Sequence, residues 1–511
     1  MNGLRWTGPM LVLLLNAALI STGGAAEQKP NIIVINIDDL GYADIGPFGS
    51  TTKTPHLDRM AAEGRKLMSH YAAPVCSPSR AALMTGCYPK RALPIPHVLF
   101  PAAAVGLHPD EVTMADVLKE AGYATACIGK WHLGDQPEFL PTRQGFDYFY
   151  GIPYSNDMGT VADGAKNNPG EPPPKPRARP RPKQNPNPNQ SPNLNVPPRK
   201  DDETGIKATA QPPLPLLRNE QVINRVKAEQ QYELTLDYTM EAREFIEQNK
   251  DRPFFLYLPH SAVHFPIYPR EEFAGKSPNG AIGDWAMEVD WSVGQVLDLL
   301  RELKLDQKTL VIFTSDNGGS VRHGSKNGPL RGGKAETWEG GMRVGTIAWW
   351  PGKIPAGTST DEITSMMDLL PTVARLGGVE LSADRKIDGV DIWPVLAGTV
   401  DGKAPRDHFF YYRGFRMEAV RFGPWKLHLD KKQLYHLGDD LGEQNDVYGQ
   451  HPEVVEKLQQ LALTMEDDLG LDGVGPGCRP LGRVVKPLPL IDLEGVVREG
   501  MTMGVNAVRF E

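Results

Sequence analysis

Short, continuous apolar segments alternate along the chain with longer segments in which apolar residues recur at helical spacing. The segments NIIVINI (31–37) and TLVIFTS (309–315) are typical of buried strands. Segments 124–131 and 252–260 are predicted as further strands, with helices over 54–67 and 110–122. This alternation predicts an α/β fold with a central, largely parallel sheet covered by helices.

The pattern changes near residue 406. Residues 407–429 are aromatic and alternate between apolar and polar positions, which predicts antiparallel strands, and residues 451–470 form an amphipathic helical pattern. We therefore expect a main domain over 27–405 and a smaller C-terminal α+β subdomain over 406–470. The C-terminal extension, 471–511, contains many glycines and prolines and predicts no particular element.

The first 26 residues have the order of a secretory signal peptide. Arg5 precedes the apolar segment MLVLLLNAALI (10–20), and small residues lead to a predicted cleavage site near Ala26. The apolar segment is too short to span a bilayer, and no later segment is apolar enough, so no transmembrane anchor is expected. We expect a secreted or periplasmic protein, whose four cysteines are too few for a disulfide framework.

A proline-rich insertion is expected at about 165–200. Of the 30 residues 169–198, 12 are proline, a composition that cannot pack a core. Its cationic run KPRARPRPK (175–183) has two interpretations, a solvated spacer or an arm that attracts a polyanionic glycan. The net charge of −8 is unlike the basic surface of nucleic-acid-binding proteins, so no nucleic-acid partner is expected.

The sequence PVCSPSRAALMTG places Cys76 at the start of a predicted helix. Pro78 suits the first turn, and Ser77 or Ser79 could cap it. Free N–H groups at a helix start favour an anion, and Arg80 adds a fixed positive charge one turn along. The alternative is a buried, inert cysteine. A tyrosine-phosphatase loop is excluded, because only three residues separate Cys76 from Arg80.

Acidic and amide side chains follow two of the predicted strands. Asp38 and Asp39 follow the strand 31–37, and Asp316 and Asn317 follow 309–315. Ligands of open α/β sheets bind beyond the carboxyl ends of the strands. Oxygen ligands suit Ca²⁺ or Mg²⁺ better than zinc, although each pair alone is also typical of a turn.

Cationic and imidazole side chains follow other strand ends. Lys130 and His132 in GKWHLG are two residues apart, so on an extended segment both would point to the same side. His264 in HSAVHFP and Lys334 in LRGGKAETWEGG lie at similar glycine- or proline-marked positions. Each alone is equally typical of a strand end whose polar side chain reaches water.

Taken together, these segments resemble the type I sulfatases of the arylsulfatase A and N-acetylgalactosamine-6-sulfatase type. The segments are, in chain order, IDDLGYADIG, CSPSRAALMTG, GKWHLG, GIPYSNDMG, HFP, SDNGG and GGKAETWEGGMR. The resemblance extends from about residue 30 to about residue 470, outside the insertion. It implies an alkaline-phosphatase-like α/β sandwich, a sulfated glycan or aryl sulfate substrate, and a maturase that oxidises Cys76 to formylglycine.

The resemblance also implies roles for individual residues. One calcium ion, with magnesium as the alternative, would be held by the modified Cys76 together with Asp38, Asp39, Asp316 and Asn317. The sulfate would be surrounded by Arg80, Lys130, His132, Ser155, His264 and Lys334. One hydroxyl of the formylglycine hydrate would attack sulfur, His264 or Lys334 would protonate the leaving alcohol, and His132 would take the proton from the second hydroxyl.

Two other functions remain open from the sequence. A phosphate or phosphonate monoester hydrolase is compatible with the same fold, because sulfate and phosphate share their geometry. A glycan-binding protein without catalytic activity would result if Cys76 were never oxidised.

Overall fold

The computed structural model describes residues 1, 3, 29–172, 203–399 and 405–502 of this 511-residue chain. Most of the predicted signal peptide and of the proline-rich insertion, including its cationic run, lies outside the described residues. Within those residues no helix has the length and apolar character needed to cross a bilayer.

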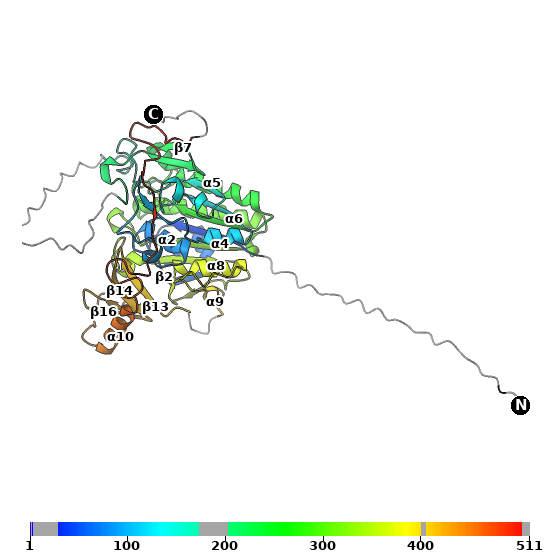
Figure 1. Ribbon diagram of the computed structural model, residues 1–511, viewed down its shortest axis with the longest axis vertical. Helices are drawn as coiled ribbons and strands as arrows, with labels where there is room; N and C mark the ends of the chain where they lie inside the picture. The colour runs from blue at the N-terminus through cyan, green and yellow to red at the C-terminus, as the bar shows by residue number, and fades with distance from the viewer. Residues whose placement is uncertain (2, 4–28, 173–202, 400–404, 503–511) are drawn as a thin grey trace, which may run out of the picture.

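A mixed, mostly parallel sheet of 11 strands forms the centre of the main domain (Figure 1). Its order is β11-β2-β10-β9-β1-β8-β4-β5-β6-β7, with β12 also paired to β2. The central strands β9, β1, β8, β4 and β5 are all parallel to one another. The strands of the sheet are β1 (Asn31–Ile37), β2 (Arg65–Tyr71), β4 (Ala124–Ile128), β5 (Tyr148–Gly151), β6 (Leu214–Arg218), β7 (Gln221–Val226), β8 (Phe254–His260), β9 (Thr309–Ser315), β10 (Arg343–Trp349), β11 (Thr358–Thr360) and β12 (Thr364–Ser365).

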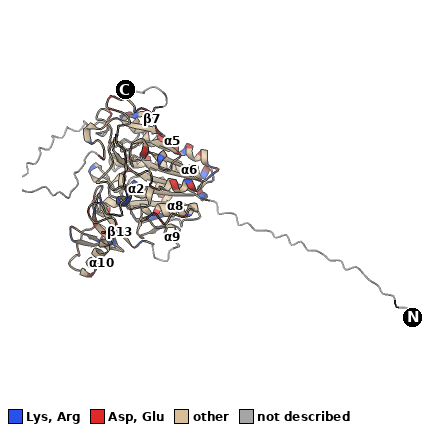
Figure 2. Cartoon of the chain, viewed as in Figure 1, with Lys and Arg blue, Asp and Glu red and all other residues tan. Residues whose placement is uncertain are grey.

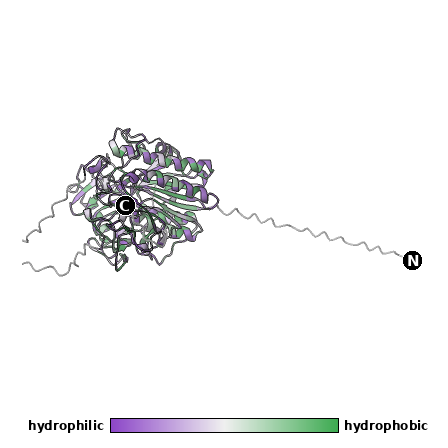
Figure 3. Ribbon diagram, turned by 90° about the horizontal axis from the view of Figure 1, so that it is seen from above, coloured by the Kyte–Doolittle hydropathy of each residue, from purple (hydrophilic) through white to green (hydrophobic). Residues whose placement is uncertain are grey.

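Helices cover both faces of this sheet, as β1 shows. Ile33 and Ile35 belong to one apolar core, and Ile32 and Val34 to the other, because successive side chains of a strand point to opposite faces. Figure 3 shows hydrophobic residues concentrated along the strands, between the two helical layers. The first core is covered by α1 (Pro55–Glu63), α5 (Ala228–Asn249) and α6 (Gly280–Glu302), and the second by α2 (Cys76–Thr85), α4 (Met114–Glu120) and α8 (Leu369–Gly377).

The strands β1 and β9 have the bounds that the sequence predicted, whereas the predicted helix 54–67 was partly wrong. The helix α1 ends at Glu63, and the chain continues into β2 from Arg65. At Gly64 the chain passes so close to β10 that an added Cβ would lie 2.3 Å from the carbonyl oxygen of Ala348. Pairing of β2 with β10 and β11 therefore overrides the helical pattern beyond residue 63.

The other predicted elements are present but shorter than their patterns. The strand expected over 124–131 ends at Ile128, and the helix expected over 110–122 is limited to α4. A capping box between Thr113 and Asp116 sets the start of α4, since each residue's side chain accepts a hydrogen bond from the other's backbone N–H.

The C-terminal subdomain is a separate four-stranded antiparallel sheet with one helix, which confirms the predicted fold class. Its elements are β13 (His408–Arg413), β14 (Arg416–Phe422), β15 (Trp425–His428), β16 (Gln433–His436) and α10 (Pro452–Leu463). The chain beyond it returns to the main domain, where β17 (Gly482–Arg483) pairs with β3 (Val105–Gly106). Leu490, Ile491 and Val497 are buried there in the second core.

Charged side chains lie mainly outside the sheet. Figure 2 shows acidic residues on the outer helices α5 and α6. Some charged side chains are instead fully buried, and one group of these, Asp38, Arg80, Lys130 and Asp316, gathers beyond the carboxyl ends of β1 and β9.

Candidate active site

The residue Cys76 begins α2 and is 2% exposed. The predicted serine cap is wrong, because Val75 is the N-cap residue and no side chain caps the helix. The Ser79 hydroxyl instead bonds both the N–H and the carbonyl of Ala73, at 2.8 and 3.0 Å, and the Ser77 hydroxyl accepts from the N–H of Leu99. Both serines therefore fix the turn around Cys76.

The two polar strand ends meet because β1 and β9 are parallel neighbours in which Ile37 is paired with Ser315. The Asp39 N–H donates to Oδ1 of Asp316 at 3.3 Å, and the Asn317 amide nitrogen donates to Oδ1 of Asp39 at 2.7 Å. Asp39 adopts a φ of 58°, a left-handed conformation that turns the chain sharply at the end of β1.

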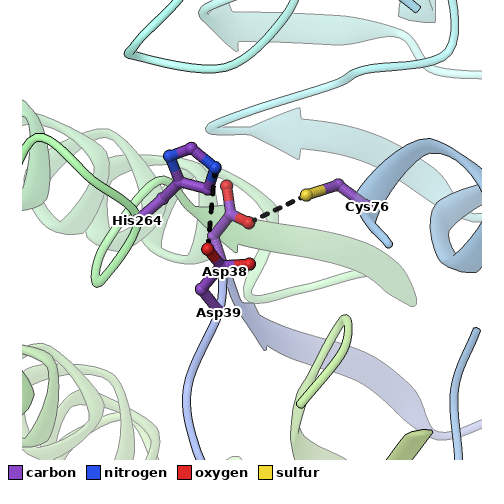
Figure 4. Close-up of side chains that lie close together, drawn as sticks. All are labelled: Asp38, Asp39, Cys76 and His264. Atoms are coloured by element: carbon purple, nitrogen blue, oxygen red, sulfur yellow. Dashed lines mark hydrogen bonds and ion pairs between the residues drawn. The ribbon is translucent and has the colours of Figure 1, made fainter. Parts of the chain in front are cut away.

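Asp38 and Asp39 lie between Cys76 and His264, as Figure 4 shows. The Cys76 Sγ lies 3.2 Å from Oδ1 of Asp38, and Nε2 of His264 lies 3.6 Å from Oδ2 of Asp39. Ligand atoms of these four buried residues lie within 4.8 Å of one another, so the cluster could hold a metal ion.

Three cations pair with the three carboxylates of the site. Lys130 bonds Oδ2 of Asp38, and Lys334 bonds Oδ2 of Asp39 at 2.7 Å. The Arg80 guanidinium donates twice to Oδ2 of Asp316, at 2.8 and 3.0 Å.

A hydroxyl and an imidazole complete this network. The Ser155 hydroxyl lies 3.2 Å from the Lys130 ammonium and 3.2 Å from Nδ1 of His264. The structure thus brings every residue of the predicted site except His132 into one connected set of contacts.

For His132, the expectation of an extended segment was wrong. The strand β4 ends at Ile128, and His132 has a φ of 65°, so simple alternation does not relate its direction to that of Lys130. Its Nε2 lies 2.9 Å from the carbonyl oxygen of Leu99 and must therefore carry the proton, which leaves the buried Nδ1 as an acceptor without a partner. Burial and then the charges of Lys130 and Arg80 lower the pKa of His132 well below its ordinary value, so the imidazole is neutral.

The electrostatics of the two central carboxylates differ. Burial acts to raise the pKa of Asp38, but the charges of Lys130 and His264 hold this pKa well below its ordinary value. Burial and the neighbouring Asp38 raise the pKa of Asp316 to about 6, against the effect of Arg80. Asp38 is therefore the stronger anion beside Cys76.

The unmodified Cys76 thiol is poorly suited to act as a nucleophile. Burial, followed by the charges of Asp316 and Asp38, raises its pKa well above the ordinary range. Because the thiolate and not the thiol is reactive, the cysteine as encoded is inert at neutral pH.

A divalent cation fits this site for two reasons. The side-chain oxygen of Asn317 is buried without a hydrogen-bond partner, although it borders Asp39, and such an atom is normally satisfied by a donor or an ion. Three carboxylates, Asp38, Asp39 and Asp316, that lie close together in space also favour a hard cation.

A second buried charge cluster, which was not predicted from the sequence, includes Glu339, a few residues beyond Lys334 in the chain. The Lys426 ammonium donates to Glu339 and Glu443, both at 2.9 Å, and all three side chains are fully buried. Glu443 in turn accepts from the N–H of Glu339 at 2.7 Å. The sequence did contain one indication of this cluster, because Lys426 occupies an inward-facing position of the strand WKLH.

Replacing Lys426 with methionine should lower the free energy of unfolding by about 3–5 kcal/mol, because two buried carboxylates would lose their shared cation. Thermal or denaturant unfolding measures this change. The exposed Lys308, replaced in the same way, is the control and should change stability little. Equal stability of the Lys426→Met variant and the wild type would contradict this account of the cluster.

The fold and the site together define a hydrolase of the alkaline-phosphatase-like α/β class. A sulfatase family model matches residues 30–379. The chain is 35% identical to dog (Canis lupus familiaris) N-acetylgalactosamine-6-sulfatase, over 94% of this chain and 96% of that protein. It is 37% identical to human (Homo sapiens) arylsulfatase A, over 87% and 89% of the two chains.

A solved structure, that of Ps i-CgsB in complex with k-i-k-neocarrahexaose, superposes with a TM-score of 0.68 and 30% identity, over 86% of this chain and 92% of that one. The chain belongs to the sulfatase family, as its sequence motifs predicted. It is therefore a sulfuric ester hydrolase.

Proposed function

We propose that this protein is an exported sulfatase that hydrolyses sulfate monoesters of carbohydrates, with formylglycine at position 76 and one calcium ion. The observation that carries the proposal is the position of Cys76, buried at a helix start 3.2 Å from Asp38 and within a network of three cations. Similarity to an N-acetylgalactosamine-6-sulfatase and to a protein solved in complex with k-i-k-neocarrahexaose supports a glycan substrate. Export is proposed from the sequence of residues 1–26, in which Arg5, the apolar segment 10–20 and small residues follow one another.

Two groups that the chain must acquire fit the site. Calcium would be held by oxygen atoms of Asp38, Asp39, Asp316 and Asn317, and would polarise the ester oxygens and lower the pKa of a nearby hydroxyl. Formylglycine at position 76, as its hydrate, would supply two hydroxyls on one carbon, one to displace the alcohol and one to release sulfate. An inert cysteine thiol explains why such a modification is needed.

The remaining side chains provide binding and proton transfer. Lys130, Lys334 and Arg80 would neutralise the sulfate oxygens from fixed positions. His264, held by Ser155, or Lys334 would protonate the leaving alcohol. The neutral His132, whose Nδ1 accepts, would take a proton from a hydroxyl at position 76.

The charge balance of the site favours a monoanionic ester. With His264 neutral and Lys334 as the proton donor, the three carboxylates Asp38, Asp39 and Asp316 are matched by Lys130, Lys334 and Arg80, so a divalent ion would leave about two positive charges. One deprotonated hydroxyl and one sulfate monoester would neutralise them. A phosphate monoester dianion would leave an excess negative charge in a buried site, which is costly.

The experiment that tests the function compares p-nitrophenyl sulfate with p-nitrophenyl phosphate. We expect kcat/KM for the sulfate to be higher by about a hundredfold, since one uncompensated buried charge costs at least a few kcal/mol. Protein produced together with a formylglycine-generating enzyme is used for both substrates. Equal efficiencies, or a preference for phosphate, would instead support the alternative of a phosphate monoester hydrolase.

A further inference from the structure

A polar groove opens beside the active site, and Lys334 belongs to both. Its ammonium bonds Asp39 within the site, and its side chain also lines a cavity of about 900 Å³. The cavity is larger than one aromatic ring requires and lies at the upper end of the range for ligand pockets. A substrate whose sulfate is held near Lys334 can therefore extend into the groove.

The chemistry of the lining suits a hydrophilic anion. Hydroxyl and amide side chains line it, and three cations face a single acidic side chain, Glu336. The Glu336 carboxylate accepts from the N–H of Gly333 at 2.9 Å, so part of its hydrogen-bonding capacity is used within its own loop. The hydroxyl and amide side chains include Ser50, Thr51, Asn279 and Ser320.

Two of the cations, Arg322 and Lys326, lie outside the catalytic network. Both are exposed, and no carboxylate forms an ion pair with either one in the part of the chain that the structure describes. Among the described residues, the Lys326 ammonium bonds only the amide oxygen of Asn279.

The backbone beneath these two cations is fixed. His323, next to Arg322, stacks on the ring of Phe265 with centroids 4.5 Å apart and bonds the Ser320 hydroxyl at 3.1 Å. The N–H of Lys326 donates to the buried carboxylate of Asp44 at 2.8 Å. The groove therefore presents its positive charges from an ordered surface, which lowers the entropic cost of binding.

The pKa of His323 places Arg322 within electrostatic reach of the active site. Burial lowers this pKa, the charges of His264, Arg322 and Lys334 lower it further, and the charge of Asp39 raises it in part. Residues from the groove and from the catalytic network thus act on one imidazole.

We propose that Arg322 and Lys326 form an anion subsite that binds a second negative group, a sulfate or a carboxylate, on the sugar next to the one that loses its sulfate. This inference rests on the proposed function and refines it. The preferred substrate is a polyanionic oligosaccharide, and the two side chains determine specificity without taking part in the chemistry.

The test uses three disaccharides that share a 6-sulfated N-acetylhexosamine and differ in the neighbouring sugar, which carries a carboxylate, a sulfate or no charge. The wild type should prefer the charged disaccharides over the neutral one by about tenfold in kcat/KM, since each exposed pair contributes up to about 1 kcal/mol. The double variant Arg322→Gln with Lys326→Gln should lose most of that preference. Its kcat/KM for p-nitrophenyl sulfate should stay unchanged, and added salt should weaken the wild-type preference.

The variant Lys308→Gln removes one exposed positive charge at the opposite end of β9, against two in the double variant, and is the control. A loss of preference for only one of the two charged disaccharides identifies whether carboxylate or sulfate occupies the subsite. An unchanged preference in the double variant, or an equal fall for all substrates, would overturn the inference.

Calorimetric binding of the same disaccharides to the Cys76→Ala variant gives a measurement that does not depend on turnover. Weaker binding of the charged disaccharides after the two groove substitutions supports the subsite even if the wild type fails to cleave them. In that case the proposed function would be wrong and the groove assignment would stand. Equal binding with and without the two cations would contradict the subsite directly.

Discussion

Replacing Cys76 with alanine should give a folded protein that cleaves sulfate esters roughly 10⁶-fold more slowly or not at all, because removal of a nucleophile costs about this much in another hydrolase. The side chain is small and buried, so alanine fills nearly the same space. Initial rates with an aryl sulfate, together with a thermal unfolding curve, measure the two expectations separately.

The matched control is Cys87→Ala, which removes another buried thiol just beyond the end of the same helix α2. This variant should keep its activity. Mass spectrometry of the peptide that contains Cys76 in the wild type should show an aldehyde in place of the thiol. Turnover by Cys76→Ala at the wild-type rate would disprove the proposed mechanism.

Replacing Asp39 with asparagine should weaken calcium binding by at least about a hundredfold, because even residues that only orient metal ligands typically account for that much. Turnover should fall by at least about 10³, since a metal ion contributes several kcal/mol of charge stabilisation. Asparagine keeps the size of the side chain and tolerates the left-handed φ of 58° at this position. Calorimetry with calcium and metal analysis of dialysed protein give the affinity and the content.

The same substitution also removes the charge that pairs with Lys334, and a calcium titration separates the two effects. If the metal is responsible, activity should recover in part at high calcium concentration. Asp306→Asn, at the start of the segment that leads into β9, is the control and should bind calcium normally. Undiminished calcium content in Asp39→Asn would show that this carboxylate is not a metal ligand.

The central strands could be predicted because a strand that is buried on both faces is a continuous run of apolar residues. β1 and β9 are continuous apolar segments, and their bounds matched the sequence pattern. The predicted helix 54–67 failed because residues 65–71 pair with β10, a partner nearly 280 residues away in the chain that no local pattern reveals.

In the candidate site, too, the features that follow from local sequence could be predicted, and those that depend on distant parts of the chain could not. Asp38 and Asp316 were placed together correctly because the carboxyl ends of parallel strands lie at one edge of a sheet. The direction of the His132 side chain was not predictable. It depends on the positive φ of His132 itself, and the sequence has no typical turn residue at this position to indicate it. The role of Lys426 was hidden as well, because its partners Glu339 and Glu443 come from other parts of the chain.

The burial of Cys76 has a consequence for how the protein is made. Its side chain is 2% exposed, and the turn around it is fixed by the buried hydroxyls of Ser77 and Ser79. If Cys76 is oxidised as proposed, the modifying enzyme would need a thiol that the folded protein buries, so the oxidation would take place while the segment is still extended. Modification and folding would then compete in time, and chains that fold first would stay unmodified and inactive. The specific activity of a preparation would then depend on the rate of synthesis and the supply of maturase as well as on the catalytic power of the finished site.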